Sequence, residues 1–213
     1  MGRKLSILAL AAVAAVGMSV GAWAQTGGSN PPPRSELSAQ VTGVFTKGTN
    51  NTPTTHVANN SAGLLVGYRV HLNNWEALEV EYGYTRNGQR YFTPSTAPNT
   101  PGTLNLVTAN MQQAIANEVI TTPRIAGVFE PFVLAGGGVV IFNPRSGSGL
   151  PVAAQTKGAF NYGFGVDFHI VHLGARVEYQ GLIFKVPDFK DPLLTVNKWT
   201  HVAQPSIGLI LTF

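Results

Sequence analysis

The sequence contains no cysteine and few charged residues. Asp, Glu, Lys and Arg make up 11% of its 213 residues, which is less than half of the roughly 25% that is usual in soluble domains. The absence of cysteine excludes disulfide scaffolds, thiolate zinc sites, cysteine nucleophiles and an N-terminal lipid on cysteine. The sequence also lacks basic blocks, and a nucleic-acid-binding protein needs clustered cations to neutralise phosphate. We therefore expect no nucleic-acid partner.

The N-terminus has the organisation of an export signal. A short basic start, Arg3-Lys4, precedes an uncharged apolar run over residues 5–20. Ala22-Trp23-Ala24 then supplies small residues at both positions that a signal peptidase reads, so we predict a cleaved signal peptide at residues 1–24. An N-terminal transmembrane helix is the alternative, because the run approaches the length needed to span a bilayer. The Gly, Ser and Pro content of residues 25–34 predicts a disordered leader.

The remainder, residues 35–213, reads as one domain of β-strands. It has no later apolar run long enough for a membrane helix. Apolar and polar side chains instead alternate with a period of two, which is typical of half-buried strands. The pattern predicts eight strands: Glu36–Thr46, Ser61–Leu72, Glu76–Arg86, Leu106–Thr121, Phe129–Phe142, Lys157–Ile170, Leu173–Ile183 and Trp199–Phe213.

Two of these strands are ambiguous. Leu106–Thr121 does not show which of its faces points outward, and the Ala and Gln content of Met111–Val119 also suits a helix. Phe129–Phe142 is apolar on both faces and contains Gly136-Gly137-Gly138. The periodicity therefore identifies these strands without fixing their facing.

Short and long connections alternate along the domain. Only Asn73–Trp75 and Val171–His172 separate two of the strand pairs, and residues 122–128 form a connection of intermediate length. The other connections are long and rich in Asn, Thr, Pro, Gly and Ser, which disfavour regular structure: Lys47–Asn60, Asn87–Asn105, Asn143–Thr156 and Val186–Lys198. Such alternation around an even number of strands is typical of outer-membrane barrels, with short turns in the periplasm and long loops outside.

The sizes of the alternating side chains favour an apolar exterior. An eight-stranded barrel has an interior just wide enough for side chains to fill. The large apolar side chains would overfill it, whereas the small and charged ones fit. A soluble, lipocalin-like barrel with the opposite facing is the alternative.

In lipid, every backbone group must find a partner, so the sheet must close. We therefore predict an all-β, eight-stranded antiparallel up-and-down transmembrane β-barrel in the bacterial outer membrane. It would contact outer-membrane lipid and lipopolysaccharide. Aromatic residues near the turns and loops would form its girdles: Trp75, Phe142, Phe160, Phe168, Trp199 and Phe213.

Two stretches resemble a known family. Ser206–Phe213, an alternating last strand that ends in Phe, looks like the C-terminal strand of the small outer-membrane β-barrel family, which shares the architecture of the outer-membrane protein A barrel. Glu130–Gly138 is similar to a strand in uncharacterised members. The resemblance implies export through the periplasm and recognition by the barrel-assembly machinery, and neither motif specifies an activity. The assembly signal would consist of Ile207, Leu209, Leu211 and Phe213.

Six charged residues fall on the inward face, close to the short turns: Arg69, Glu79, Glu81, Asp167, Arg176 and Glu178. Opposite charges in a narrow, partly dehydrated lumen should pair, because an unpaired charge there is costly. We expect a salt-bridge network that plugs the barrel. The alternative is a gate, in which rearranged pairs open a narrow ion path.

The sequence gives little support for catalysis or for a cofactor. Hydrolysis needs a histidine that reaches both a nucleophile and an orienting acid. His169 is placed to approach Asp167 or Glu178, but no serine is clearly placed at that depth, and no cluster has metal-ligand spacing.

We therefore predict a non-enzymatic protein without metal or cofactor, whose barrel anchors surface loops for a structural or recognition role. Asn87–Asn105 is the main candidate for recognition, and the sequence identifies neither its ligand nor an oligomeric state. The first alternative is a narrow channel for ions, small solutes or apolar molecules. The second is a lipid-modifying enzyme.

Overall fold

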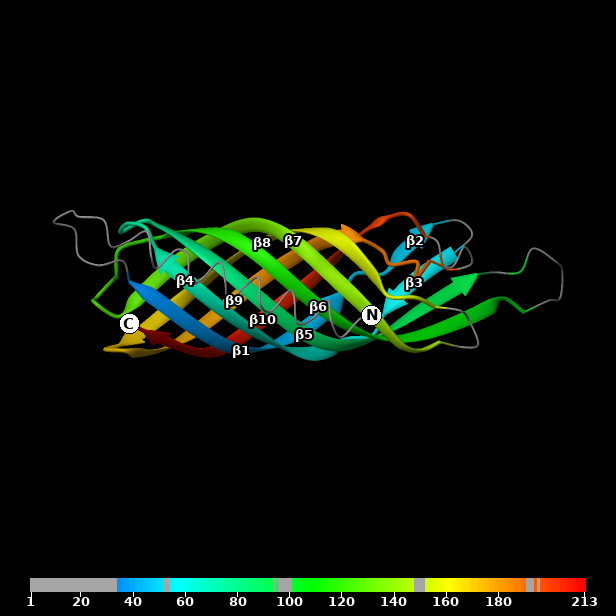
Figure 1. Ribbon diagram of the computed structural model, residues 1–213, viewed down its shortest axis with the longest axis horizontal. Coiled ribbons are helices and arrows are strands. Elements are labelled where there is room, and N and C mark those ends of the chain that lie inside the picture. The colour runs from blue at the N-terminus through cyan, green and yellow to red at the C-terminus, as the bar shows by residue number, and fades with distance from the viewer. Residues whose placement is uncertain are drawn as a thin grey trace.

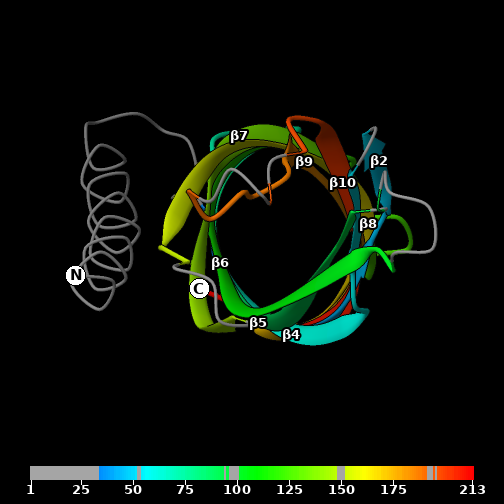
Figure 2. The ribbon, with the colours of Figure 1, turned by 90° about the vertical axis from the view of Figure 1, so that its right-hand side faces the viewer.

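The chain forms a closed antiparallel barrel of eight strands (Figures 1 and 2). The computed structural model describes residues 34–213, except residues 52–53, 94, 96–100, 148–151, 191–193 and 195. The predicted signal peptide and residues 25–33 of the predicted leader lie outside this part. The barrel strands are β1 (Ser35–Thr46), β4 (Ser61–His71), β5 (Glu76–Thr93), β6 (Thr103–Thr121), β7 (Phe129–Gly147), β8 (Gln155–Ile170), β9 (Leu173–Lys185) and β10 (Trp199–Thr212).

The order of the ladders confirms the predicted fold. Neighbouring barrel strands pair in sequence from β4 to β10, and β1 pairs with both β4 and β10, which closes the ring. Figure 2 shows this ring almost end on. Among the described residues, no helix is long and apolar enough to cross a membrane.

The alternating faces lie as predicted. Phe164 and Leu209 are 58% and 67% exposed on the outer surface, whereas Asp167 and Arg176 are fully buried inside. The strand left open by the sequence, β6, turns its odd-numbered residues from Asn105 to Thr121 inward. The helix considered for part of this strand is absent, because both neighbours, β5 and β7, pair with it along its length.

Three of the predicted long connections contain strand residues. Within residues 143–156, β7 continues as far as Gly147 and β8 begins at Gln155. Within residues 47–60 a hairpin forms from β2 (Thr49–Asn51) and β3 (Thr54–Ala58). β3 pairs with residues 89–92 of β5, beyond the part of β5 that pairs with β4. Within residues 87–105, β5 and β6 continue to pair as far as Thr93 and Thr103. The prediction of loops here was wrong because turn-forming composition hid a continuing two-residue alternation, in which Asn87, Gln89 and Tyr91 point inward.

The two ends of the barrel differ. The turns 72–75 and 171–172 lie at the same end as the first and last residues of the barrel, where Ser35 and Phe213 exchange two backbone hydrogen bonds of 3.0 Å. We call this the turn end. The opposite, loop end carries the β2–β3 hairpin and the extended β5–β6 hairpin, which projects beyond the other strands (Figure 1).

The seam between β1 and β10 closes the barrel, and Pro205 interrupts it. The ladder runs from Glu36↔Thr212 to Thr42↔Ser206 and resumes at Phe45↔Ala203. Proline has no backbone N–H to give to a ladder. At this point the hydroxyl of Thr42 donates to the carbonyl of Pro205 at 3.0 Å, which replaces part of the missing backbone pairing.

The close approach of β7 to β6 requires glycine in β7. A Cβ added at Gly138 would lie 2.1 Å from the carbonyl oxygen of Ala114 in β6, whereas one added at Gly158 in β8 would meet nothing within 4 Å. We predict that Gly138→Ala lowers the free energy of unfolding by roughly 1–3 kcal/mol, the usual cost of overpacking.

Urea unfolding, followed by the heat-modifiable mobility of the folded barrel on gels, measures this difference. Gly158→Ala is the matched control and should unfold at the urea concentration of the wild type. Equal midpoints for the two variants would contradict the proposed close approach.

Candidate functional site

The interior at the turn end is a ring of alternating cationic and anionic side chains. Arg69 on β4 binds Glu79 Oε2 on β5 through Nε at 2.9 Å and Asp167 Oδ2 on β8 through Nη1 at 2.9 Å. Arg176 on β9 binds Asp167 Oδ1 through Nε at 2.7 Å and Glu79 Oε2 through Nη1 at 2.8 Å. These four buried side chains bridge the lumen, and they pair as the sequence predicted.

An aromatic ring that the sequence did not single out packs against both guanidinium groups. The ring centroid of Phe132 lies 4.3 Å from Cζ of Arg69 and 5.1 Å from Cζ of Arg176. Such cation–π contacts strengthen when water is excluded. Phe132 was missed because its strand, β7, is apolar on both faces and gave no sign of which residues point inward.

A second group of ion pairs lies nearer the turn end. Arg34 binds Glu36 at 3.0 Å and Glu130 at 2.5 Å, and Arg124 binds Glu130 at 3.2 Å. His169 faces these carboxylates, with Nε2 3.3 Å from Glu130. The expected approach of His169 to Asp167 or Glu178 is therefore replaced by contact with β7, the strand paired with β8.

Glu81 and Glu178 lie one layer deeper, and neither makes an ion pair with any described residue. Glu81 accepts hydrogen bonds from the amides of Gln113, at 3.0 Å, and Gln180, at 2.7 Å. Glu178 accepts from the amides of Gln180, at 2.7 Å, and Gln40, at 3.2 Å. The prediction of salt bridges is thus wrong for these two residues, because the side chains that reach them are neutral.

More amides complete this middle layer. Gln113 and Gln204 donate to each other across the lumen, at 3.3 and 2.9 Å, and Asn161 donates to Asn117 at 3.0 Å. The middle layer therefore contains two buried carboxyl groups whose hydrogen-bond donors are all side-chain amides.

The interior near the loop end is apolar. Inward side chains from six barrel strands form one buried cluster here: Val44, Tyr91, Val107, Ala109, Met111, Ile115, Val140, Phe142, Leu182, Phe184 and Val202. Phe142, expected in an aromatic girdle, is 1% exposed, and its ring lies 5.6 Å from that of Phe184. That assignment was wrong because the large apolar residues on both faces of β7 concealed its facing.

The connection between β9 and β10 covers this apolar layer. Phe189, Leu194 and Val196 are fully buried in the same cluster. The hydroxyl of Tyr91 donates to the carbonyl of Pro187 at 2.5 Å, and the amide of Ala153 donates to the carbonyl of Phe189 at 3.0 Å. The described part of this predicted surface loop therefore closes the loop end of the barrel.

Asp188 anchors the cover at its rim. It accepts a hydrogen bond from the side-chain amide of Gln155 and one from the backbone amide of Lys190, at 3.1 Å, and Lys157 lies 3.8 Å away. Partial burial acts to raise the pKa of Asp188, but the Lys190 backbone amide, the Gln155 amide and Lys157 together hold that pKa below its ordinary value. The carboxylate therefore stays charged and hydrogen-bonded at neutral pH.

The remaining predicted residues lie on the outer surface. Trp75, Phe160, Trp199 and Phe213 are each more than half exposed, and Phe168 is partly exposed against Phe129. The outward side chains of the last strand include all four residues of the expected assembly signal: Ile207, Leu209, Leu211 and Phe213. Their facing agrees with the predicted roles, which stay predictions.

Comparison with known proteins identifies the fold. No protein-family model and no curated protein matches the chain. Among solved structures, it is similar to Ail, the attachment invasion locus protein of Yersinia pestis, in complex with the heparin analogue sucrose octasulfate. The TM-score is 0.53 at 17% identity, covering 85% of this chain and 99% of that chain.

Two further structures show the same likeness. Neisserial surface protein A matches with a TM-score of 0.56 at 12% identity over 84% of this chain and 97% of its own. The outer membrane protein OprG from Pseudomonas aeruginosa matches with a TM-score of 0.54 at 12% identity over 85% of this chain and 96% of its own. The chain therefore has the fold of the small outer-membrane β-barrel proteins.

Proposed function

We propose that this chain is an exported bacterial outer-membrane protein without enzymatic activity, whose plugged barrel anchors a recognition surface outside the cell. The observation that carries this proposal is the filled interior. Ion pairs occupy the turn end, amides and carboxylates the middle, and apolar side chains the loop end, where residues of the β9–β10 connection cover them.

The outer surface supports a location in lipid. Large apolar side chains cover it on every barrel strand, among them Leu64, Phe164, Val177 and Leu209. An apolar surface of this extent is too costly to expose to water. Because the ladders close into a ring, each of the eight barrel strands pairs with a neighbour on both sides, as a bilayer requires. The turn end would face the periplasm.

The β5–β6 hairpin is the best candidate for recognition. Its outer face carries the exposed residues Arg86, Arg90, Phe92, Leu104 and Leu106. A guanidinium beside apolar and aromatic side chains is a composition that protein interfaces favour. The hairpin projects beyond the barrel (Figure 1), so such a surface would be accessible to a partner outside the cell.

The two alternatives have weaker support. A recess at Gly83, lined by residues that include Leu65, Met111 and Gln113, is too narrow to hold a water molecule, whereas ligand pockets measure roughly 300–1,000 Å³. This favours a plug over a channel. For a lipid-modifying enzyme, a histidine would have to activate a hydroxyl nucleophile. In the described part of the chain, no histidine hydrogen-bonds to serine or threonine.

The filled lumen predicts that the purified protein gives no stable conductance in planar bilayers. Phe189→Ala, which trims the cover alone, should also stay closed, because the ion-pair layer at the turn end remains. Single-channel recording measures both proteins. Large, regular openings of the wild type that disappear when the lumen is blocked would overturn the plug and favour the channel.

The ion-pair layer predicts a strong dependence of stability on Arg176. Arg176→Met removes the guanidinium that binds Asp167, Glu79 and Glu36 and leaves buried carboxylates uncompensated. Breaking a buried pair in this way costs about 3–5 kcal/mol. Urea unfolding in detergent micelles measures the loss. Arg86→Met, on the exposed outer face, should unfold like the wild type, and equal effects of the two substitutions would refute the plug's structural role.

The absence of cysteine allows the orientation to be tested by labelling single introduced thiols. Arg90→Cys, on the protruding hairpin, should react with a membrane-impermeant maleimide on intact cells, and Asn73→Cys, in a turn, should react only after the outer membrane is permeabilised. Fluorescence of the isolated protein measures the reaction. Labelling of both or neither in intact cells, or the reverse pattern, would contradict the proposed orientation.

A further inference from the structure

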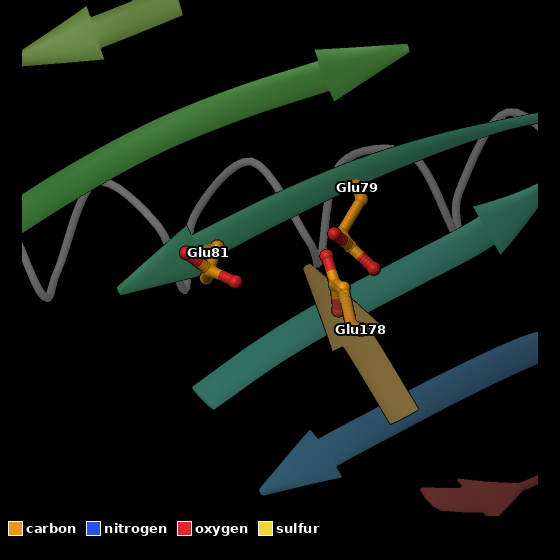
Figure 3. A group of neighbouring side chains, drawn as sticks. All are labelled: Glu79, Glu81 and Glu178. Atoms are coloured by element: carbon orange, nitrogen blue, oxygen red, sulfur yellow. The ribbon is translucent and has the colours of Figure 1, made fainter. Parts of the chain in front are cut away.

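Three buried carboxylates approach one another in the barrel interior. Glu79 and Glu81 lie on β5 and Glu178 on β9, and one oxygen of each lies within 4.8 Å of the other two. Figure 3 shows Glu79 and Glu178 pointing toward each other, with Glu81 to one side along β5. Like charges this close repel strongly in a dehydrated site, so a cation that binds all three would be stabilising.

The balance of charge around these residues is negative. In the described interior, six buried carboxylates (Glu36, Glu79, Glu81, Glu130, Asp167 and Glu178) face four guanidinium groups (Arg34, Arg69, Arg124 and Arg176). With all six carboxylates ionised and the histidines neutral, two negative charges are left over. The carboxylates that lack an ion pair are Glu81 and Glu178, whereas His71 and His169 lie beside other carboxylates, Glu36 and Glu130.

Two buried oxygen atoms beside the cluster accept no hydrogen bond from a described residue. One is Glu79 Oε1, since both arginines bind the other oxygen of that carboxylate. The other belongs to Gln180, a fully buried side chain outside the acidic set. Its amide nitrogen donates to both Glu81 and Glu178 at 2.7 Å, so a half-turn of this amide brings its carbonyl oxygen to face both carboxylates. An unused neutral oxygen next to unneutralised carboxylates is a further ligand for a hard cation.

We propose that Glu79, Glu81, Glu178 and the carbonyl oxygen of Gln180 form a binding site for one divalent cation, with Ca²⁺ as the best fit. A divalent ion supplies the two positive charges that the interior lacks. Ca²⁺ takes oxygen ligands at about 2.3–2.6 Å. Two ligands on opposite sides of one ion are then at most about 5 Å apart, which accommodates carboxylate oxygens within 4.8 Å of one another.

The position of the site determines when the ion enters. Ion pairs close the lumen on one side of the site, and the apolar layer with its cover closes it on the other. An ion at this place is captured as the barrel folds and is then shielded from chelators. The cation therefore has to be supplied or withheld during refolding. The proposal does not depend on the cell-surface role, since a barrel with any function would contain the same site.

The experiment is to refold the full mature chain from urea into zwitterionic detergent micelles, free of lipopolysaccharide, with EDTA, CaCl₂ or MgCl₂. The metal content of the desalted protein is measured by mass spectrometry, and its thermal unfolding by circular dichroism. We expect one Ca²⁺ per barrel after refolding in CaCl₂. The unfolding midpoint should rise by several degrees relative to EDTA, with a smaller rise in MgCl₂, because a ligand that binds the folded state alone stabilises it.

The matched variants are Glu81→Gln with Glu178→Gln at the site, and Glu118→Gln on the exposed outer face of β6. The double variant should bind no ion and unfold at the same temperature in EDTA and in CaCl₂. Glu118→Gln should retain the ion and the calcium-dependent shift. If the double variant does not fold, Glu178→Gln alone replaces it in the experiment. This single variant should bind Ca²⁺ more weakly than the wild type.

Two outcomes would overturn the proposal. If the wild type retains no divalent ion and unfolds at one temperature in all three buffers, protons neutralise the surplus carboxylates. If the double variant retains the ion and the shift, the cation binds elsewhere on the barrel. The metal content of the wild type alone decides the first case, whatever the folding yield of the variants.

Discussion

Closure of the hydrogen-bonded ladder is the constraint on which the rest of the structure depends. When the outer side chains of a sheet are apolar and the inner ones polar, two sets of groups need hydrogen-bond partners. They are the backbone groups at the strand edges and the polar side chains inside. Pairing of β1 with β10 removes the edges in the barrel, and it also fixes how many side chains must share the interior. With eight strands that space is narrow, so the inward side chains of one strand crowd against those of others. The composition of the interior follows from this crowding.

The side chains that fill the narrow interior differ between its two ends. At the turn end, Arg69 and Arg176 alternate with carboxylates and are covered by Phe132, so their charges are compensated in a space without room for bulk water. At the loop end, the lining is apolar and is covered by a segment whose turn contains Phe189 and Lys190 at φ values of 49° and 63°. Such backbone conformations are uncommon for residues other than glycine. The buried Phe189 ring, in contact with Tyr91 and Phe142, compensates for that strain.

The two-residue alternation predicted the strands, their outward faces and the clustering of charge near the turns, because each of these depends on neighbours in the chain. The alternation did not predict the apolar layer, because β7 is apolar on both faces. Which way Phe132 and Phe142 point is set by the strands that pair with β7. The alternation also missed the extension of β5 and β6, where Asn and Gln point inward although their composition suggests loops. The contacts of Glu178 with Glu81 and Gln40 join β9 to β5 and β1. Such contacts depend on the stagger of the whole ring, which local sequence does not encode.

The gap at Pro205 has a consequence for how the molecule assembles. The first and last strands of a barrel are the farthest apart in the chain, so the ladder between them carries the largest loss of chain entropy and forms late. Here that ladder is divided into a long segment beside the chain termini and a short segment beyond the proline. The long segment can pair first and fix the register of the two strands, after which the short segment pairs. In the finished molecule the same division leaves a break in the seam, which the Thr42 hydroxyl spans.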